Sequence, residues 1–149
     1  MTSADGGPAL FRLVRFWSRR WARGVAGDGG SVAQHVLTVE AIRACGAEPA
    51  VGDVARQLGL DHSGASRMVA AATERGYVER ARGAADARRS VLRLTPAGHE
   101  LIAASHQWQR ETFERLTASW GEEDRSRFAG YLVRLAAETG ADMPLRGHG

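Results

Sequence analysis

The chain has 149 residues and a formal net charge of +3, from 20 basic and 17 acidic side chains. This length fits one domain of ordinary size and excludes a large multidomain enzyme. Because 44% of the residues are hydrophobic and four are tryptophan, the composition is that of a folded protein rather than a disordered one. Every basic residue is arginine. Arginine favours planar contacts with phosphates and guanine, although a GC-rich genome would produce the same bias.

The sequence also limits the compartment. A single cysteine, Cys45, excludes an internal disulfide, so nothing indicates an oxidising environment. Asp5 stands where a secretion signal would carry positive charge, and no run of about 18 apolar residues is long enough to span a membrane. We therefore expect a soluble cytoplasmic protein with no membrane partner.

The first two periodic segments predict helices. Apolar side chains at three- and four-residue spacing predict an amphipathic helix from residue 8 to about residue 25, namely Leu10, Val14, Trp17 and Trp21. After a glycine-rich break at 27–30, Ser31 is the expected N-cap of a second helix. This second helix should stop near Gly46.

Between Pro49 and Gly76, the pattern predicts two short helices joined by a tight turn. We expect Gly59 to end the first helix in a left-handed conformation, Leu60 to pack inward and Asp61 to cap the second helix. The inward face of the second helix would carry Ala65, Met68, Val69 and Ala72. Its outward face would carry His62, Ser63, Ser66 and Arg67, which is the arrangement of a helix-turn-helix.

A β-hairpin should follow, because the hydrophobic period changes to two. We expect strands at 77–79 and 91–94, with an arginine-rich loop at 82–89 forming a wing. Thr95 would then cap a long helix that ends at Gly121. A final helix is expected to reach about residue 138 and to leave a frayed tail at 140–149.

The charges separate along the chain. Residues 56–93 contain eight arginines and four acids, whereas residues 94–149 contain six arginines and eight acids. The helix-turn-helix and the wing therefore carry +4 and the C-terminal helices −2. A helix N-terminus with serine and arginine side chains beside an arginine-rich loop is typical of a protein that reads duplex DNA.

In this order, three segments resemble the MarR (multiple antibiotic resistance regulator) family of winged-helix transcription factors. They are the strand Gly-Tyr-Val-Glu-Arg at 76–80, the wing Asp-Ala-Arg-Arg at 86–89 and the helix start Leu-Arg-Leu-Thr-Pro-Ala-Gly at 92–98. The likeness extends over about residues 10 to 138. Two positions depart from the family pattern: Gly64, where a polar or β-branched residue is usual, and Ala50, where a Ser or Thr commonly caps the helix.

The resemblance implies a mainly α (α+β) fold, a winged helix-turn-helix with N- and C-terminal dimerisation helices. Residues 1–46 and 95–149 would form the helical dimerisation region and residues 47–94 the DNA-binding lobe, together making one intertwined domain. It also implies a homodimer that binds double-stranded DNA at a pseudo-palindromic operator and acts as a repressor. The half-sites would lie about one helical turn apart, roughly 10–10.5 bp.

We expect Arg67 to contact bases in the major groove and Arg88 to enter the minor groove. Asp86 would orient Arg88 or Arg89, because a carboxylate in a DNA-facing loop would otherwise repel phosphate. Further contacts, mainly with the DNA backbone, are expected from His62, Ser63, Ser66, Arg75, Arg82 and Arg89.

Family members often bind small aromatic effectors where the dimerisation helices meet the DNA-binding lobe. The matching residues here would be Trp17, His35, Val36 and Trp108, for which simple core packing is the alternative. Core and dimer contacts are likewise expected for Trp17, Trp21, Trp108, Phe113, Trp120, Phe128 and Leu132.

Other functions remain as alternatives. A winged-helix module that binds proteins instead of DNA would share this pattern. A metal or redox sensor would depend on His35, Cys45, His99 and His106, which are scattered and form no dense ligand motif. No glycine-rich phosphate loop, nucleophile elbow or paired-carboxylate setting occurs, so we expect neither an enzyme nor a cofactor.

Overall fold

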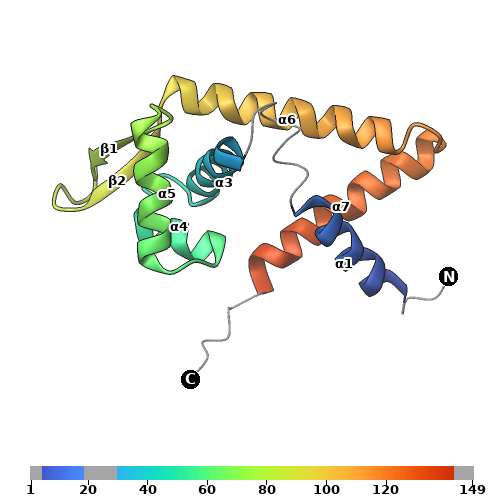
Figure 1. The fold of residues 1–149 in the computed structure, drawn as a ribbon. Helices are drawn as coiled ribbons and strands as arrows, with labels where there is room; N and C mark the ends of the chain where they lie inside the picture. The colour runs from blue at the N-terminus through green and yellow to red at the C-terminus, as the bar shows by residue number, and fades with distance from the viewer. Residues whose placement is uncertain (1–4, 19–29, 143–149) are drawn as a thin grey trace. The chain divides into compact units, whose positions relative to one another are not determined.

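The structure, a computed structural model, describes residues 5–18 and 30–142. In chain order its elements are α1 (Gly6–Trp17), α3 (Gly30–Ala44), α4 (Val51–Leu58), α5 (His62–Glu74), β1 (Val78–Arg82), β2 (Ser90–Leu94), α6 (Pro96–Leu116) and α7 (Glu122–Asp142) (Figure 1). The chain divides into two compact units, Met1–Trp108 and Gln109–Gly149, which are described separately. Within the described ranges, no helix combines the length and apolar character needed to cross a membrane.

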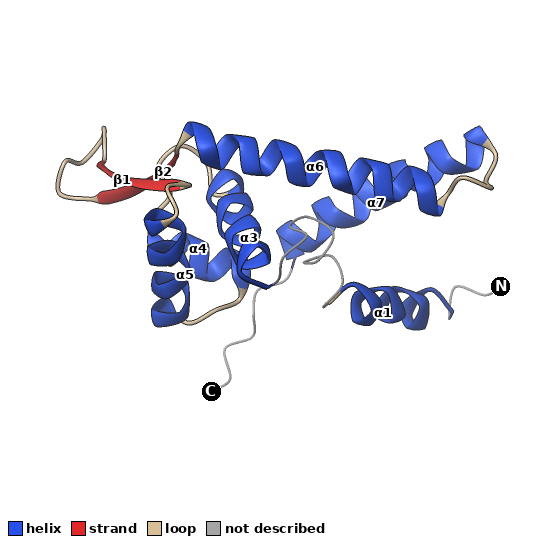
Figure 2. Ribbon diagram, turned by 45° about the horizontal axis from the view of Figure 1, so that its top comes forward, coloured by secondary structure: helices blue, strands red, loops and turns tan. Residues whose placement is uncertain are grey.

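The first unit is organised around one hydrophobic core. Helices α3, α4 and α5 gather beside the β1–β2 hairpin, and the first part of α6 lies along them (Figure 2). The core residues are Val39, Ala41, Ile42, Val54, Ala55, Ala65, Val69, Ala72, Val78, Leu92 and Ile102. Helix α3, which we assigned to the dimerisation region, packs against α4, α5 and β2 and supplies three of these side chains. It therefore forms part of the core that holds the helix-turn-helix.

The turn between α4 and α5 has the predicted chemistry. Gly59 takes the left-handed conformation at φ +64°, and the Asp61 carboxylate accepts a hydrogen bond of 2.7 Å from the Gly64 amide. A Cβ at Gly64 would lie 2.7 Å from that same carboxylate oxygen, so the glycine leaves room for the cap. The expectation for Leu60 is wrong. Its side chain is 41% exposed, because it lies in the turn rather than over the core.

The N-terminal helices differ from the prediction at their ends. Helix α1 begins at Gly6, two residues early, and ends at Trp17; residues 19–25 of the predicted helix, with Trp21, lie outside the described residues. Helix α3 begins at Gly30, so Ser31 lies inside the helix and is not its cap. A terminator near Gly46 is confirmed, since α3 ends at Ala44 and Gly46 has φ +90°.

The wing is a two-stranded antiparallel hairpin with Val78 opposite Leu94 and Arg82 opposite Ser90. Strand β1 is longer than predicted, and Arg82 belongs to the strand instead of the loop, because its partner Ser90 extends the ladder by one pair. The Leu92 amide donates to the Pro49 carbonyl at 2.7 Å, which ties β2 to the segment before α4. Because Arg82 belongs to β1, the loop is shorter than predicted and consists of residues 83–89.

The start of α6 is fixed to the end of α5. The predicted cap Thr95 is confirmed, since its hydroxyl accepts from the Gly98 amide at 3.1 Å and donates to the Gly76 carbonyl at 2.5 Å. The Thr95 amide donates to the Tyr77 carbonyl at 3.1 Å. A Cβ at Gly98 would overlap that carbonyl oxygen, so only glycine lets the helix approach this closely.

The second unit holds the end of α6 and all of α7. Helix α6 ends at Leu116, before the predicted Gly121, because a turn intervenes in which the Trp120 amide donates to the Thr117 carbonyl at 2.9 Å. The Phe128 ring stacks on Phe113 and lies against Trp120, with ring centroids 6.0 and 5.1 Å apart. Helix α7 runs to Asp142, so the tail predicted to fray from residue 140 begins as helix.

Candidate nucleic-acid interface

The N-terminal half of α5 presents polar side chains. His62, Ser63 and Arg67 are exposed and Ser66 is half-buried, while the inward face buries Ala65, Val69 and Ala72. The first amides of a helix carry a partial positive charge, which favours a phosphate at this end. One end of α5 therefore combines two hydroxyl groups, an imidazole and a guanidinium at the surface.

Arg75 is separated from this cluster. It is the C-cap of α5, a helix of 13 residues, and so lies about 20 Å along the axis from the first turn. Its positive charge instead acts on His35, whose pKa is lowered first by burial and then by Arg75. The structure thus does not bring Arg75 together with Arg67.

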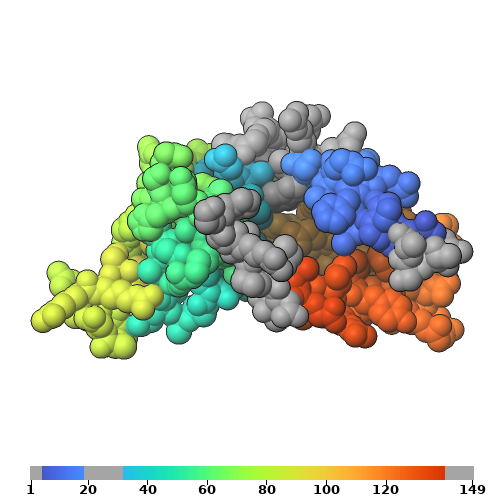
Figure 3. All heavy atoms as spheres, turned by 90° about the horizontal axis from the view of Figure 1, so that it is seen from below, coloured from blue at the N-terminus to red at the C-terminus, as the bar shows by residue number. Residues whose placement is uncertain are grey.

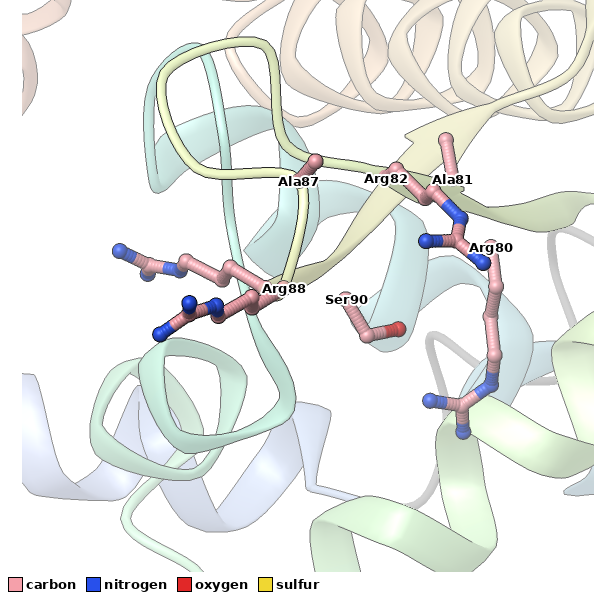
Figure 4. A pocket seen from close by; sticks show the side chains of 7 residues that line it. Arg80, Ala81, Arg82, Ala87, Arg88 and Ser90 are labelled. Atoms are coloured by element: carbon pink, nitrogen blue, oxygen red, sulfur yellow. The ribbon is translucent and has the colours of Figure 1, made fainter.

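The wing forms the second basic feature. Arg80, Arg82, Arg88 and Arg89 line a hollow of about 440 Å³ together with Ala81, Ala87 and Ser90 (Figure 4). We call it the wing hollow. All four arginines are exposed, and the wing lies at the surface beside α4 and α5 (Figure 3). Sequence reasoning missed Arg80 and Ser90, and the signal for both was the strand register that places them near Arg82.

Two aspartate carboxylates contact the arginines of the wing. The Asp86 Oδ1 atom accepts a hydrogen bond of 3.0 Å from the Arg88 backbone amide, so it shapes the loop at that residue. Arg89 instead reaches Asp53 of α4, with Nη2 3.2 Å from Oδ2. Gly83 closes the loop, since its amide donates to the Arg89 carbonyl at 2.9 Å and a Cβ there would lie 2.6 Å from the Asp86 carbonyl oxygen.

Asp53 was missed as a site residue. Its Oδ2 atom also accepts from the Ala50 amide at 2.8 Å, and its Oδ1 atom pairs with Arg56. This carboxylate therefore replaces the missing Ser or Thr cap at Ala50 by supplying the reciprocal half of a capping box. The signal was an acid three residues after the start of α4, although its wing partner is 36 residues away.

The four predicted effector residues lie in two separate contacts. The Trp17 and Trp108 rings meet edge to face with centroids 6.0 Å apart. His35 is buried against Tyr77, with centroids 5.5 Å apart, and Val36 beside it is 2% exposed. The His35 Nδ1 atom is buried and has no hydrogen-bond partner within the described part of the chain.

The residues of the metal and redox alternatives do not converge. His106 Nε2 lies 2.5 Å from Glu40 Oε1, linking α6 to α3, and His99 is exposed. Burial raises the pKa of the Cys45 thiol, and Asp53 raises it further while Arg56 opposes the shift. Residues 5–18 and 30–142 contain no group of three or more His, Cys, Asp or Glu side chains able to hold a metal ion.

Comparison with known proteins gives the fold and one family match within the chain. No curated protein sequence matches the chain. Among solved structures, a MarR family protein from Bacillus stearothermophilus has 18% identity and a TM-score of 0.72, with 94% of this chain and 99% of that chain covered.

Two further structures contain bound molecules. A point mutant of Staphylococcus aureus MepR, bound to an oligodeoxyribonucleotide, has 16% identity and a TM-score of 0.59, with 93% of this chain and 99% of that one covered. The transcriptional regulator PcaV from Streptomyces coelicolor, in complex with its natural ligand, has 20% identity and a TM-score of 0.59, with 92% and 96% covered.

These structures establish the winged-helix fold over more than nine tenths of the chain. The sequence profile of the MarR family matches residues 33–89, from α3 through the helix-turn-helix to the end of the wing loop. Over this segment, the chain is similar to the MarR family of transcriptional regulators.

Proposed function

We propose that the protein is a sequence-specific double-stranded DNA-binding regulator that acts as a homodimeric repressor in the cytoplasm. The observation that carries this proposal is the presence, in one lobe, of an exposed basic α5 N-terminus and the four-arginine wing hollow. The first feature carries the guanidinium group of Arg67 and the second carries four more, and such groups suit phosphate and guanine. The oligodeoxyribonucleotide bound to MepR, a protein of the same fold, supports DNA as the partner.

In this proposal, α5 enters the major groove and Arg67 pairs with a guanine edge. Ser63, Ser66 and His62 contact phosphates near the helix N-terminus. Arg88 enters the minor groove, while Arg82, Arg89 and Arg75 contact the backbone of the duplex. Asp86 shapes the loop and Asp53 positions Arg89, and neither carboxylate contacts DNA.

A second copy of the chain is the proposed partner of the apolar surfaces outside the lobe. Helix α1 has no buried residue and exposes Leu10, Phe11, Leu13, Val14 and Phe16. Helix α7 exposes Tyr131, Leu132, Val133 and Leu135. Large apolar side chains exposed in this number favour an interaction surface. Two lobes joined in this way would reach half-sites about 10–10.5 bp apart.

Release by a small aromatic effector is part of the proposal. The PcaV structure contains its natural ligand, which supports ligand control for a protein of this fold. In this chain, the unpartnered His35 Nδ1 and the Trp17–Trp108 contact are the features that an aromatic molecule with one polar group would suit. The effector would act by favouring a spacing of the two α5 helices that the operator cannot accept.

The test begins with DNA fragments selected from the genome by the purified protein. Arg67→Ala should relax discrimination at one base pair by about 1–3 kcal/mol. Arg88→Ala should weaken binding to all sequences and reduce the salt slope by about 1 per protomer. Arg43→Ala removes another exposed arginine, at the end of α3, and should leave binding unchanged. Selection of no DNA at all would favour a protein-binding module.

A further inference from the structure

One hydroxyl group lies inside the wing hollow. Ser90 is the first residue of β2, is exposed, and pairs with Arg82 at the last step of the ladder. Figure 4 shows its side chain between Arg88 on one side and Arg80 and Arg82 on the other. A hydroxyl group therefore lies among the arginines that line the wing hollow.

The hollow has more positive charge than the protein itself neutralises. Within the described part of the chain, Arg89 has an ion-pair partner in Asp53, whereas Arg80, Arg82 and Arg88 have no carboxylate within 4.0 Å. A phosphate dianion provides oxygen acceptors that match the paired donors of guanidinium groups. The hollow of about 440 Å³ has room for a phosphate monoester.

We propose that Ser90 is a phosphorylation site and that its phosphate fills the wing hollow and switches off DNA binding. The regulatory consequence rests on the proposed DNA-binding function. In the reaction, Ser90 Oγ bonds to the γ-phosphorus of ATP, and the bond from that phosphorus to the β–γ bridging oxygen breaks. ADP leaves with the electron pair, and the hydroxyl proton passes to the base of a serine/threonine kinase.

Ser90 is better placed for this reaction than the other serines between residues 47 and 108. Ser63 and Ser66 lie within α5, and Ser105 is fully buried in α6. Ser90 follows the loop 83–89 and directly follows Arg88 and Arg89, which a kinase with an acidic cleft would bind. To present it, the terminal ladder pair and the hydrogen bond from the Gly83 amide to the Arg89 carbonyl have to open. Such contacts at the end of a hairpin open at small free-energy cost.

The phosphate would act on DNA binding in two ways. Its charge of about −1.5 to −2 cancels about two of the four guanidinium charges, and it repels the phosphates of the duplex. Because each lost phosphate contact reduces the salt slope by about 0.9, two lost contacts per protomer should reduce it by about 1.8. We expect operator affinity to fall by at least about tenfold at physiological salt.

The first experiment places phosphoserine at position 90 by amber suppression in the full-length protein. Operator binding is compared with the unmodified protein and with phosphoserine at Ser126, an exposed serine of α7. Loss of affinity and a shallower salt slope only at position 90 support the proposal. Equal affinities of the three proteins overturn it, whereas failure of the unmodified protein to bind DNA contradicts the proposed function instead.

A second readout does not depend on DNA. Phosphorus NMR titration should give a lower second pKa for phosphoserine 90 than for phosphoserine 126, because the guanidinium groups stabilise the dianion. Arg82→Ala with Arg88→Ala should return this pKa to the control value. An unshifted pKa at position 90 would show that the hollow does not hold the phosphate.

The third measurement asks whether the modification occurs. Protein isolated from its native cells is digested with a protease that does not cleave at arginine, since trypsin would cut directly before Ser90. Mass spectrometry should find phosphate on Ser90 in at least one growth phase. Its absence in every growth phase would overturn the assignment of Ser90 as a modified residue.

Discussion

A single carboxylate, that of Asp53, joins the start of α4 to the wing. It accepts a hydrogen bond from the Ala50 amide and pairs with Arg56 and Arg89. Both the cap of α4 and the position of the wing therefore depend on this carboxylate. Because its side chain is 24% exposed and Arg56 is 75% exposed, we assign most of its stabilising effect to the cap and little to the ion pairs.

Replacement of this carboxylate should therefore affect stability and binding together. Asp53→Asn is expected to lower the free energy of unfolding by about 1 kcal/mol, measured by urea denaturation, because the cap is weakened. Operator affinity should also fall as Arg89 is released. Asp86→Asn is the comparison. If that variant weakened DNA binding more than Asp53→Asn, the loop carboxylate would be the main orienting group, as the sequence first indicated.

His35 predicts how stability depends on pH. Burial lowers the pKa of His35 in the folded state, and Arg75 lowers it further. The unfolded chain, with a histidine pKa near about 6.5, then takes up the proton first as the pH falls. The contribution of neutral His35 is therefore complete above that value and is lost as the pH falls toward the folded-state pKa.

The matching experiment compares urea denaturation at about pH 8 and about pH 5.5. The wild type should lose stability on acidification, and His35→Asn should lose less, although it starts from a lower value. His62→Asn, at an exposed position of α5, should retain the wild-type pH dependence. An unchanged slope in the His35 variant would assign the pH dependence to other groups.

Among the elements, the join between Gly76–Tyr77 and the start of α6 is the most demanding in geometry. Gly98→Ala should destabilise the protein by about 1–3 kcal/mol or more, because its methyl group overlaps the Tyr77 carbonyl. Gly130 lies in an exposed turn of α7, and a Cβ added there would have no other atom within 4 Å. Gly130→Ala should therefore stabilise the helix by about 0.5–1 kcal/mol. Thermal denaturation of both variants checks the opposite signs. Equal changes in melting temperature for the two variants would mean that helix propensity alone determines the effect of each substitution on stability.

Sequence periodicity predicted the existence and order of the described elements, because each carries a consistent apolar face. It failed mainly at their ends. Arg82 looked like part of a polar loop, yet pairing with Ser90 makes it a strand residue. The last helix was expected to reach about residue 138, yet α7 continues through Gly140 to Asp142, since glycine ends a helix only where the backbone turns left-handed. Helix ends depend on contacts that a local pattern does not contain.

At the scale of the molecule, the apolar face of α7 makes a prediction about assembly. Tyr131→Glu with Leu135→Glu should give a monomer in sedimentation velocity, because buried carboxylates would be left without partners. Operator affinity should fall by about 100-fold or more as bivalent binding is lost. Ser126→Glu, on the charged side of α7, should remain a dimer. A wild-type monomer would contradict the proposed assembly.

The candidate site was predictable in its chemistry but not in its connections. The sequence indicated α5 and the wing arginines from charge and spacing. It could not show that Arg89 binds Asp53, 36 residues earlier, or that Arg80 and Ser90 share a hollow, because these depend on tertiary packing and strand register. Conversely, the position of Arg75 at the far end of α5 follows from helix length alone.

The segment 48–53 touches the wing at three points: Glu48 accepts from the Ala84 amide, Pro49 accepts from Leu92, and Asp53 pairs with Arg89. Hydrogen exchange should register this attachment as one cooperative opening event. The amides of Ala50, Ala84 and Leu92 would then give the same free energy of opening despite their separation in sequence. Bound operator would slow hydrogen exchange at all three amides together. DNA binding at the wing could therefore be detected from the exchange of the Ala50 amide, at the start of α4.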